Sequence, residues 1–472
     1  MTGTSGKIDR STKLALVAMA LGVFVVANDF TALSVAIPEI EHDLDTTLTS
    51  AQWVINGYAL VFGVLIVTGG RLADLFGRKR IFMIGAGVFA VFSLAAGLMP
   101  SVVPLVVCRG LMGIGGALMW PAILGMTYAL LPEEKAGLAG GLILGVAGLG
   151  NAVGPLLGGF LTDELSWRWV FFINVPVTAF AVFVTYRVVS ESTVDAANRH
   201  IDYAGVAVLS IGIISILLAL DEGPDQGFGD PAILALFALG AVLLGAFLVV
   251  ERRQGEGALV PNDVLRNRVF TGSCGAVLLM SAIFFSALLY LPQFFEKVLG
   301  YSPLGSGAGL LPLMAVFAVS SFVAGPLYGR VGARVVVAAG AGCLAIGIFW
   351  LSLLDADSSY ASLVPGMIVL GIGVGLFYSS ITTVAVTALD PSKSSLAGGI
   401  VYMCQIAGGA VGLGFNTAIV ASGSSLSDGI SLAFKIDAGL AVAGLLLVLA
   451  VIGRHEEATP RASLRTHHRA HA

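Results

Sequence analysis

Charged side chains are scarce in this chain. Of its 472 residues, 11% are charged and 57% are hydrophobic, and the mean hydropathy is +0.93. Composition of this kind lies outside the range of soluble globular domains and predicts a polytopic membrane protein embedded in a lipid bilayer. We expect no nucleic-acid partner. The formal net charge of -4 carries little further information.

Cysteine is also rare, with four residues in the whole chain. Each lies in an apolar run without the spacing of a metal site or a disulfide framework, so we interpret all of them as small packed side chains. The predicted helices contain no clustered histidines, no histidine–acid pair and no nucleotide-binding loop. We therefore expect no metal and no cofactor, and a membrane-embedded enzyme is the less favoured class of protein.

Apolar runs of about 20 residues, the length that crosses a bilayer, recur along the chain. They predict an all-α protein with fourteen membrane helices. The expected spans are 14–38, 50–70, 80–99, 102–130, 137–162, 168–188, 203–220, 231–250, 269–295, 306–328, 334–354, 362–388, 396–421 and 432–453.

The basic residues indicate how these helices are oriented. An even number of spans places both termini on one side, and almost all Lys and Arg residues fall in the segments of that side. Arg168, Lys297 and Lys435 fall on the other side, and Arg109 lies within a helix. By the positive-inside rule both termini are expected in the cytoplasm. The first run is longer than a signal-peptide core and is interpreted as a retained helix.

Two halves of the chain resemble each other. The segment GGRLADLFGRKR (69–80) has a weaker counterpart in GPLYGRVGAR (325–334), and the same offset carries the first helix onto the ninth. Parallel repeats of this kind are typical of secondary transporters, and one chain then holds both halves, so a monomer suffices. The expected division is a cytoplasmic tail (1–13), a six-helix bundle (14–188), a linker with two extra helices (189–268), a second six-helix bundle (269–453) and a second cytoplasmic tail (454–472). The extra pair is interpreted either as a spacer or as a lateral partner surface.

The segment 69–80 also carries a motif. Gly70 and Gly77 allow tight backbone geometry, Asp74 is suited to a helix N-terminus or an arginine, and Arg78 and Lys79 fix the cytoplasmic side. This pattern resembles the loop signature of the major facilitator superfamily, in which it forms a conformational latch between the two halves. The resemblance implies that family's fold, with two six-helix bundles and here two inserted helices.

A second motif, GLGNAVGPLLGGF (148–160), places glycines at a spacing of four on one helix face, where another helix can approach closely. A proline then removes a backbone donor and kinks the helix. The segment is similar to the superfamily's antiporter motif, which implies export. The residues concerned are Gly150, Gly154, Pro155, Gly158 and Gly159.

Three further strings resemble those of the fourteen-helix drug:proton antiporter group of this superfamily. They are SWRWVFFINVPV (166–177), VVCRGLMGIGGAL (106–118) and the stretch VVANDFTALSVAIPEI (25–40). The second string has Met112 where glutamine is usual, and the third has Ser34 where asparagine is common. The tryptophans of the first string also suit an ordinary aromatic belt at the membrane interface.

Asp29 is interpreted as the only carboxylate inside a predicted helix, and Arg109 as the only cation. Both lie at similar depths at about 1.5 Å per residue, so we expect them to pair. A charge at the bilayer centre costs about 2.5 to 3.5 kcal/mol, which predicts a partner or a cavity. One interpretation is that Asp29 alternates between a proton and a cationic substrate. The other is a structural ion pair that orients the first and fourth helices.

The function that these observations favour is proton-coupled export of amphipathic drugs or secondary metabolites through the plasma membrane of a bacterium. With one intramembrane acid the substrate is expected to be monocationic or neutral. A symporter or facilitator of a polar nutrient, with the same fold, and a channel are the alternatives. Further candidates to line the substrate cavity are Asn28, Asn56, Tyr58, Asn151, Gln293, Tyr378 and Gln405.

Overall fold

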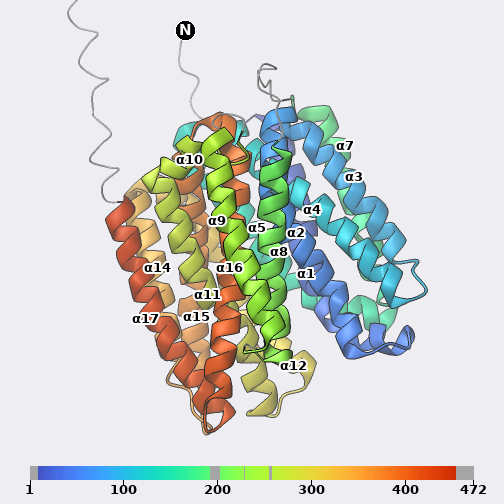
Figure 1. Cartoon of the computed structure of the whole chain (residues 1–472), viewed down its shortest axis with the longest axis vertical. Helices are drawn as coiled ribbons and strands as arrows, with labels where there is room; N and C mark the ends of the chain where they lie inside the picture. Colours follow the sequence, from blue (N-terminus) through green and yellow to red (C-terminus); the bar gives the residue numbers. More distant parts are fainter. Residues whose placement is uncertain (1–8, 192–201, 228, 255–257, 453–472) are drawn as a thin grey trace, which may run out of the picture.

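The computed structural model describes residues 9–191, 202–227, 229–254 and 258–452 (Figure 1). Within this part of the chain, fourteen helical segments are long and apolar enough to span a membrane, which confirms the predicted number. Residues 1–8 of the expected first cytoplasmic tail (1–13) and the whole of the expected second tail (454–472) lie outside the described residues. The helices of the first half are α1 (Arg10–Asp43), α2 (Leu48–Phe76), α3 (Arg78–Ala96), α4 (Val102–Leu130), α5 (Ala136–Glu164), α6 (Arg168–Phe172) and α7 (Asn174–Val188). The rest are α8 (Tyr203–Gln226), α9 (Pro231–Gln254), α10 (Asn262–Arg266), α11 (Arg268–Lys297), α12 (Pro303–Ala308), α13 (Leu311–Val331), α14 (Ala333–Leu351), α15 (Tyr360–Thr387), α16 (Ser394–Ala421) and α17 (Leu426–Ile452).

Helix ends follow capping chemistry more than hydropathy. The first helix was expected to begin at residue 14, but it begins at Arg10, because the Asp9 carboxylate accepts a hydrogen bond from the Thr12 backbone N–H at 2.9 Å. Thr47 caps α2 in the same way through Ser50. Polar residues therefore extend these helices beyond the apolar cores that the sequence identifies.

The predicted span 168–188 agrees with a membrane segment from Arg168 to Val188, in which a one-residue turn at Ile173 separates α6 from α7. Trp167, expected in an aromatic belt, is 1% exposed, and its indole N–H donates to Asp43 at the end of α1. The Arg168 guanidinium also bonds the Asp43 carboxylate, at 2.5 Å. This corner of the motif therefore ties α1 to α6, whereas Trp169 is exposed as a belt residue would be.

The repeat of the sequence is visible in the backbone. Gly77 between α2 and α3 has φ 102°, and Gly332 between α13 and α14 has φ 86°, so both junctions use a conformation that favours glycine. The matched glycines of the preceding helices also pack alike. A Cβ on Gly70 would lie 2.6 Å from the Ser395 carbonyl oxygen of α16, and one on Gly325 would lie 2.8 Å from the Gly137 carbonyl oxygen of α5. In each half the second helix therefore packs closely against the fifth helix of the other half, α2 against α16 and α13 against α5.

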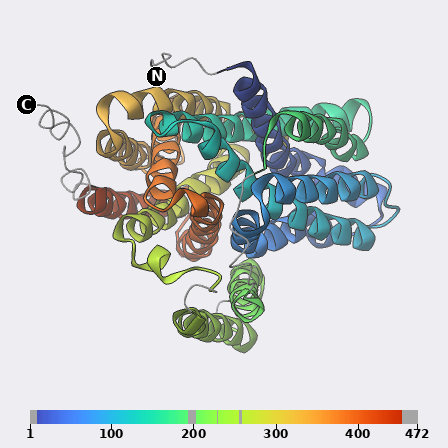
Figure 2. The same ribbon diagram turned by 90° about the horizontal axis from the view of Figure 1, so that it is seen from above.

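The inserted helices α8 and α9 form a hairpin outside the two bundles. Seen from above, α9 is the outer helix of the pair, and α8 lies closer to the seam between the blue and the red helices (Figure 2). The helix α8 contacts both α2 and α16, which belong to different halves. The spacing of the internal repeat indicated that the pair is an insert, but its position over this seam depends on tertiary contacts.

Candidate functional site

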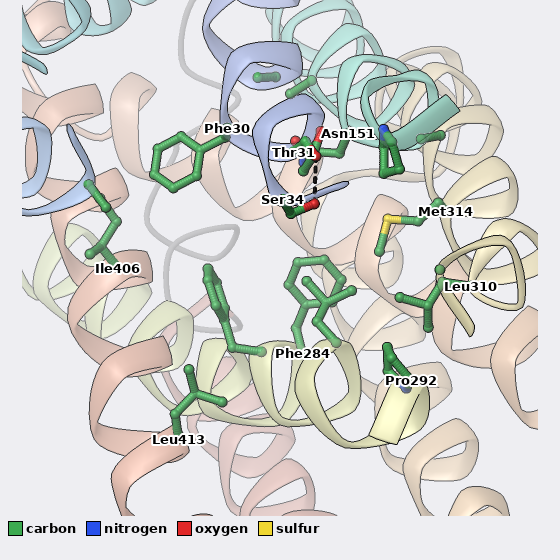
Figure 3. A pocket seen from close by; sticks show the side chains of 18 of the residues that line it. Phe30, Thr31, Ser34, Asn151, Phe284, Pro292, Leu310, Met314, Ile406 and Leu413 are labelled. Atoms are coloured by element: carbon green, nitrogen blue, oxygen red, sulfur yellow. Dashed lines mark hydrogen bonds between the residues drawn. The ribbon is translucent and has the colours of Figure 1, made fainter. Parts of the chain in front are cut away.

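A cavity of about 760 Å³ lies between the two halves. Phe30, Thr31 and Ser34 of α1 face Phe284 of α11 across it, with Met314 of α13 at one side (Figure 3). Its lining residues come from the middle of the bundle and from the ends of the helices opposite the α2–α3 turn. No Lys, Arg or His is among the described lining residues. The walls are mostly apolar with a few hydroxyl and amide groups, which is the usual character of a small-molecule site.

Three of the predicted cavity residues, Asn56, Asn151 and Gln405, line this space. The structure places the other four away from it. The amides Asn28 and Gln293 are absent from the lining, Tyr58 is fully buried, and the Tyr378 hydroxyl is 2.8 Å from Ser281. Sequence alone could not separate these groups, because which face of a helix meets the cavity depends on the partner helices.

The expected pair of Asp29 and Arg109 is present and fully buried. The Arg109 Nη1 atom donates to Asp29 Oδ2 at 2.5 Å, and its Nε atom donates to the Val54 carbonyl at 2.7 Å. The guanidinium carbon lies 4.3 Å from the centre of the Tyr58 ring, so the buried ring stacks on the cation. A second donor, Asn174 Nδ2 of α7, reaches Asp29 Oδ1 at 2.9 Å.

This pair does not touch the cavity in the present conformation. Its neighbours on α1, Ala27, Phe30 and Thr31, line the space, whereas the Asp29 carboxylate turns towards α4 and α7. A ligand in the cavity therefore contacts the helix that carries Asp29 without contacting its carboxylate.

The glycines of α5 hold that part of α1 in place. A Cβ on Gly150 would lie 3.0 Å from the Ala27 methyl, and one on Gly154 or Gly158 would collide with Thr31 or the Ala32 backbone. Gly159 has no such neighbour, and Pro155 lines the cavity. The predicted close helix approach is thus present, with α1 as the partner.

The segment 69–80 closes the end of the bundle opposite the cavity mouth. Asp74 accepts hydrogen bonds from the backbone N–H groups of Ser395 and Leu396, at 3.2 and 2.7 Å, at the start of α16. A carboxylate is well placed there because these N–H groups have no partner within the helix. Arg78 bonds Asp74 at 3.0 Å and donates to the Pro391 carbonyl at 2.6 Å.

Other members of the motif hold the turn itself. The Lys79 ammonium donates to the carbonyl oxygens of Tyr186 and Val189, at 2.9 and 2.7 Å, at the end of α7. Gly77 supplies the positive φ described above. Asp74 and Arg78 each make bonds to the other half, at the start of α16 and at Pro391, whereas those of Lys79 remain within one half.

Removal of the Asp74 carboxylate is expected to open this end of the bundle. Each charge-assisted hydrogen bond contributes about 1.5 to 3 kcal/mol, so Asp74→Ala should raise the population open at the latch at least about tenfold. The measure is alkylation of a single cysteine at buried Thr127 of α4, in a chain whose four native cysteines are replaced. Glu134→Ala, at an exposed acid near the same end, is the control. Equal alkylation in both variants would contradict a latch.

Two buried polar residues were missed by the sequence interpretation, and a third residue at the cavity was not singled out. Asn174 lies inside the string 166–177 and bonds Asp29. Asp437 lies in α17 at 0% exposure, so the interpretation of Asp29 as the only carboxylate within a helix was wrong. Its position inside the predicted span 432–453 was signal enough to find it. Glu296 is the one carboxylate among the described lining residues.

Lys435 also lies within α17 and within the predicted span 432–453. The interpretation of Arg109 as the only cation inside a helix was therefore wrong too, although Lys435 is exposed whereas Arg109 is fully buried.

Comparison with known proteins identifies the family to which these features correspond. The model of the Major Facilitator Superfamily matches residues 19–319 and 311–471. The tetracenomycin C resistance and export protein of Streptomyces glaucescens is 33% identical over 407 residues, which are 86% of this chain and 76% of that protein. The puromycin resistance protein of Streptomyces alboniger is 34% identical over 429 residues, or 90% of this chain and 83% of that protein.

A third relative and a solved structure agree with this assignment. The cephamycin export protein of Amycolatopsis lactamdurans is 33% identical over 457 residues, which cover 96% of this chain and 93% of that protein. The crystal structure of the human organic anion transporter MFSD10 superposes with a TM-score of 0.66 at 13% identity, over 93% of this chain and 99% of that one. The structural likeness concerns the fold.

Proposed function

Because the chain belongs to the major facilitator superfamily, we propose that it is a proton-coupled exporter of amphipathic drugs or secondary metabolites. The observation that carries this proposal is the cavity between the halves, with the Asp74 contacts closing one end and a buried acid–base pair beside it. Relatives over most of the chain are named for resistance to, or export of, tetracenomycin C, puromycin and cephamycin.

The lining of the cavity selects the substrate class. Aromatic and aliphatic side chains offer apolar contact, and Asn56, Asn151 and Gln405 offer hydrogen bonds. Without a basic residue in the described lining, an anion has no partner there. The Glu296 carboxylate at the end of α11 favours a cation. Neutral and monocationic amphipathic molecules are therefore the proposed substrates.

Asp29 is the proposed proton-coupling group. Its carboxylate is fully buried, and the Arg109 guanidinium is its charged partner. Protonation removes the partner of a buried cation, so the arrangement of α1 against α4 and α7 depends on the proton. Since Ala27, Phe30 and Thr31 lie on the same helix and line the cavity, substrate and proton act on one element.

Alternating access then requires the two ends to open in turn. In this structure the end that contains the 69–80 segment is closed and the cavity extends towards the other end. By the positive-inside rule the closed end is cytoplasmic, as are both termini, in the plasma membrane of a bacterium. Proton entry from outside and substrate release to the outside both use this conformation. A single chain holds both halves and works as a monomer.

The direct test is transport by the purified protein in proteoliposomes. A fluorescent lipophilic cation and a neutral dye are offered with an imposed pH gradient, with the gradient dissipated, and with Asp29→Asn. The proposal predicts uphill exchange with wild type only while the gradient persists. Gradient-independent equilibration by both proteins would instead support a facilitator.

The α8 helix also contributes to the proposed site, through Leu217, Leu218 and Leu220. Exchange of Leu217 and Leu218 for alanine removes part of this wall, so binding of a bulky apolar dye should weaken about tenfold, or about 1.4 kcal/mol. Fluorescence titration in detergent measures the affinity. Alanine at Leu234 and Leu239, which are exposed on α9, is the control and should leave it unchanged. An unchanged affinity in the α8 variant would limit the insert to a spacer.

A further inference from the structure

A second buried acid lies in the half that lacks the Asp29–Arg109 pair. Asp437 is eleven residues from the start of α17 (437 minus 426), or about 16 Å along the helix at about 1.5 Å per residue. That depth is close to the middle of a bilayer. Its exposure is 0%, so its carboxyl group has no contact with bulk water in this conformation.

The partners of Asp437 are neutral. Asn416 Nδ2 of α16 donates to its Oδ1 and Oδ2 atoms, at 3.2 and 3.1 Å. Ser286 of α11 lies close enough to interact with the carboxyl, and its hydroxyl has no other partner among the described residues. By contrast, Asp29 is neutralised by a guanidinium.

The surrounding elements supply no compensating charge within the described part of the chain. The helix α17 packs against α11, α14 and α16. From α11 the titratable group that faces Asp437 is the hydroxyl of Tyr290, which bonds Thr417 of α16 at 2.8 Å. No charged side chain of α14 or α16 acts on it, and Lys435 on α17 itself is exposed. An isolated carboxylate is costly in such surroundings, whereas a neutral acid is not.

We propose that Asp437 is a second proton-binding site, which holds a proton in one state of the transport cycle and releases it in another. This inference rests on the proposed function, because the proton it carries is one of those exchanged for substrate. The binding step is simple: the proton adds to a carboxylate oxygen, and the group changes from charge -1 to neutral.

Asn416 can bond both forms of the acid. In the present arrangement its Nδ2 group donates to the carboxyl, while its Oδ1 atom is buried without a hydrogen-bond partner. Rotation of the amide by half a turn presents that oxygen as an acceptor for a protonated Asp437. The amide nitrogen therefore donates a hydrogen bond to the ionised acid, and the amide oxygen accepts one from the protonated acid.

The position of Asn416 joins this site to the transport machinery. Leu413, one helical turn earlier on α16, lines the cavity, and the first residues of the same helix bond Asp74. A change in the hydrogen bonding of Asp437 thus acts on α16, the helix that both lines the cavity and forms the contact with Asp74. Only about one turn of α16 separates Asn416, the hydrogen-bond partner of the acid, from the cavity residue Leu413. A movement of α16 against α11 is therefore the proposed route by which water reaches the acid.

The first part of the test reads the proton directly. Infrared difference spectra of the purified full-length protein, recorded between acid and alkaline pH, show the C=O stretching band of protonated carboxylic acids. One such band is expected to disappear in Asp437→Asn and to persist in Asp428→Asn, an exposed acid of the same helix. In Asn416→Ala, which leaves the acid in place, the band should persist to more alkaline pH because a donor to the ionised form is lost. A band unchanged in both Asp437→Asn and Asn416→Ala would overturn the proposal.

The second part counts protons in proteoliposomes. The number of protons exchanged per substrate molecule is obtained from the membrane potential and pH gradient at which net substrate flux reverses. This ratio should fall by one in Asp437→Asn. A lost band with an unchanged ratio would show an acid that binds and releases a proton outside the transport cycle, and would also overturn the proposal. If wild type shows no gradient-driven flux, the proposed function fails, while the infrared titration still decides whether Asp437 binds and releases a proton.

Discussion

Arg109→Met is expected to lower the free energy of unfolding by about 3 to 5 kcal/mol and to abolish gradient-driven transport. The change leaves the Asp29 carboxylate at 0% exposure, and the Asn174 amide is then its one remaining hydrogen-bond donor among the described residues. It also removes the cation that packs on the Tyr58 ring. Thermal unfolding in detergent and flux in proteoliposomes measure the two effects.

The matched variants separate loss of charge from loss of packing. Asp29→Asn should destabilise less, because asparagine keeps an oxygen acceptor and Arg109 keeps the Val54 carbonyl at 2.7 Å. The double variant Asp29→Asn with Arg109→Met should recover part of the lost stability, since no buried charge remains, but not transport. Arg109→Met with wild-type stability and transport would contradict the importance of the pair.

Gly158→Ala is expected to cost about 1 to 3 kcal/mol, or to prevent folding, although it adds a single methyl group. That methyl would collide with the Ala32 backbone of α1, and a backbone cannot yield as a flexible side chain does. The movement of α1 would shift Asp29 relative to Arg109, so transport should fall as well. Melting temperature and flux are the measurements.

Gly159 provides an adjacent control. A Cβ there has its nearest neighbour, the Val35 side chain, at 3.7 Å, which is ordinary contact. Gly159→Ala should therefore be neutral or slightly stabilising, because alanine is the better helix former. Since both changes are the same in chemistry and helical context, their difference isolates the close approach of α5 to α1. Similar melting temperatures for the two variants would contradict it.

The fold was readable from the sequence because membrane helices are specified by length and hydropathy. Fourteen spans, the parallel repeat and the glycine turn at Gly77 all follow from local pattern. The one-residue turn at Ile173 was not predicted, since a continuous apolar run carries no signal for a local turn within a membrane segment. The helix start at Arg10 was missed because a capping bond, and not hydropathy, sets it.

The candidate site was only partly readable. Similar depth was sufficient to expect the contact between Asp29 and Arg109, but depth does not tell which way a side chain turns around its helix. The shielding of Asp29 from the cavity, and the part played by Asn174, depend on how α1, α4 and α7 meet. Asp437 was overlooked within a correctly predicted span. The expectation of a monocationic or neutral substrate began from a single acid, and it now rests on the lining of the cavity instead.

The central claim is that proton and substrate exchange through Asp29, and proton release on substrate binding tests it most directly. Purified protein in weakly buffered detergent solution is titrated with a lipophilic cation and with a neutral amphipathic compound while released protons are measured. The account predicts that binding expels protons from wild type and that Asp29→Asn binds the compound with fewer protons released. Equal release by both proteins, or binding without release by either, would contradict Asp29 as the exchange site.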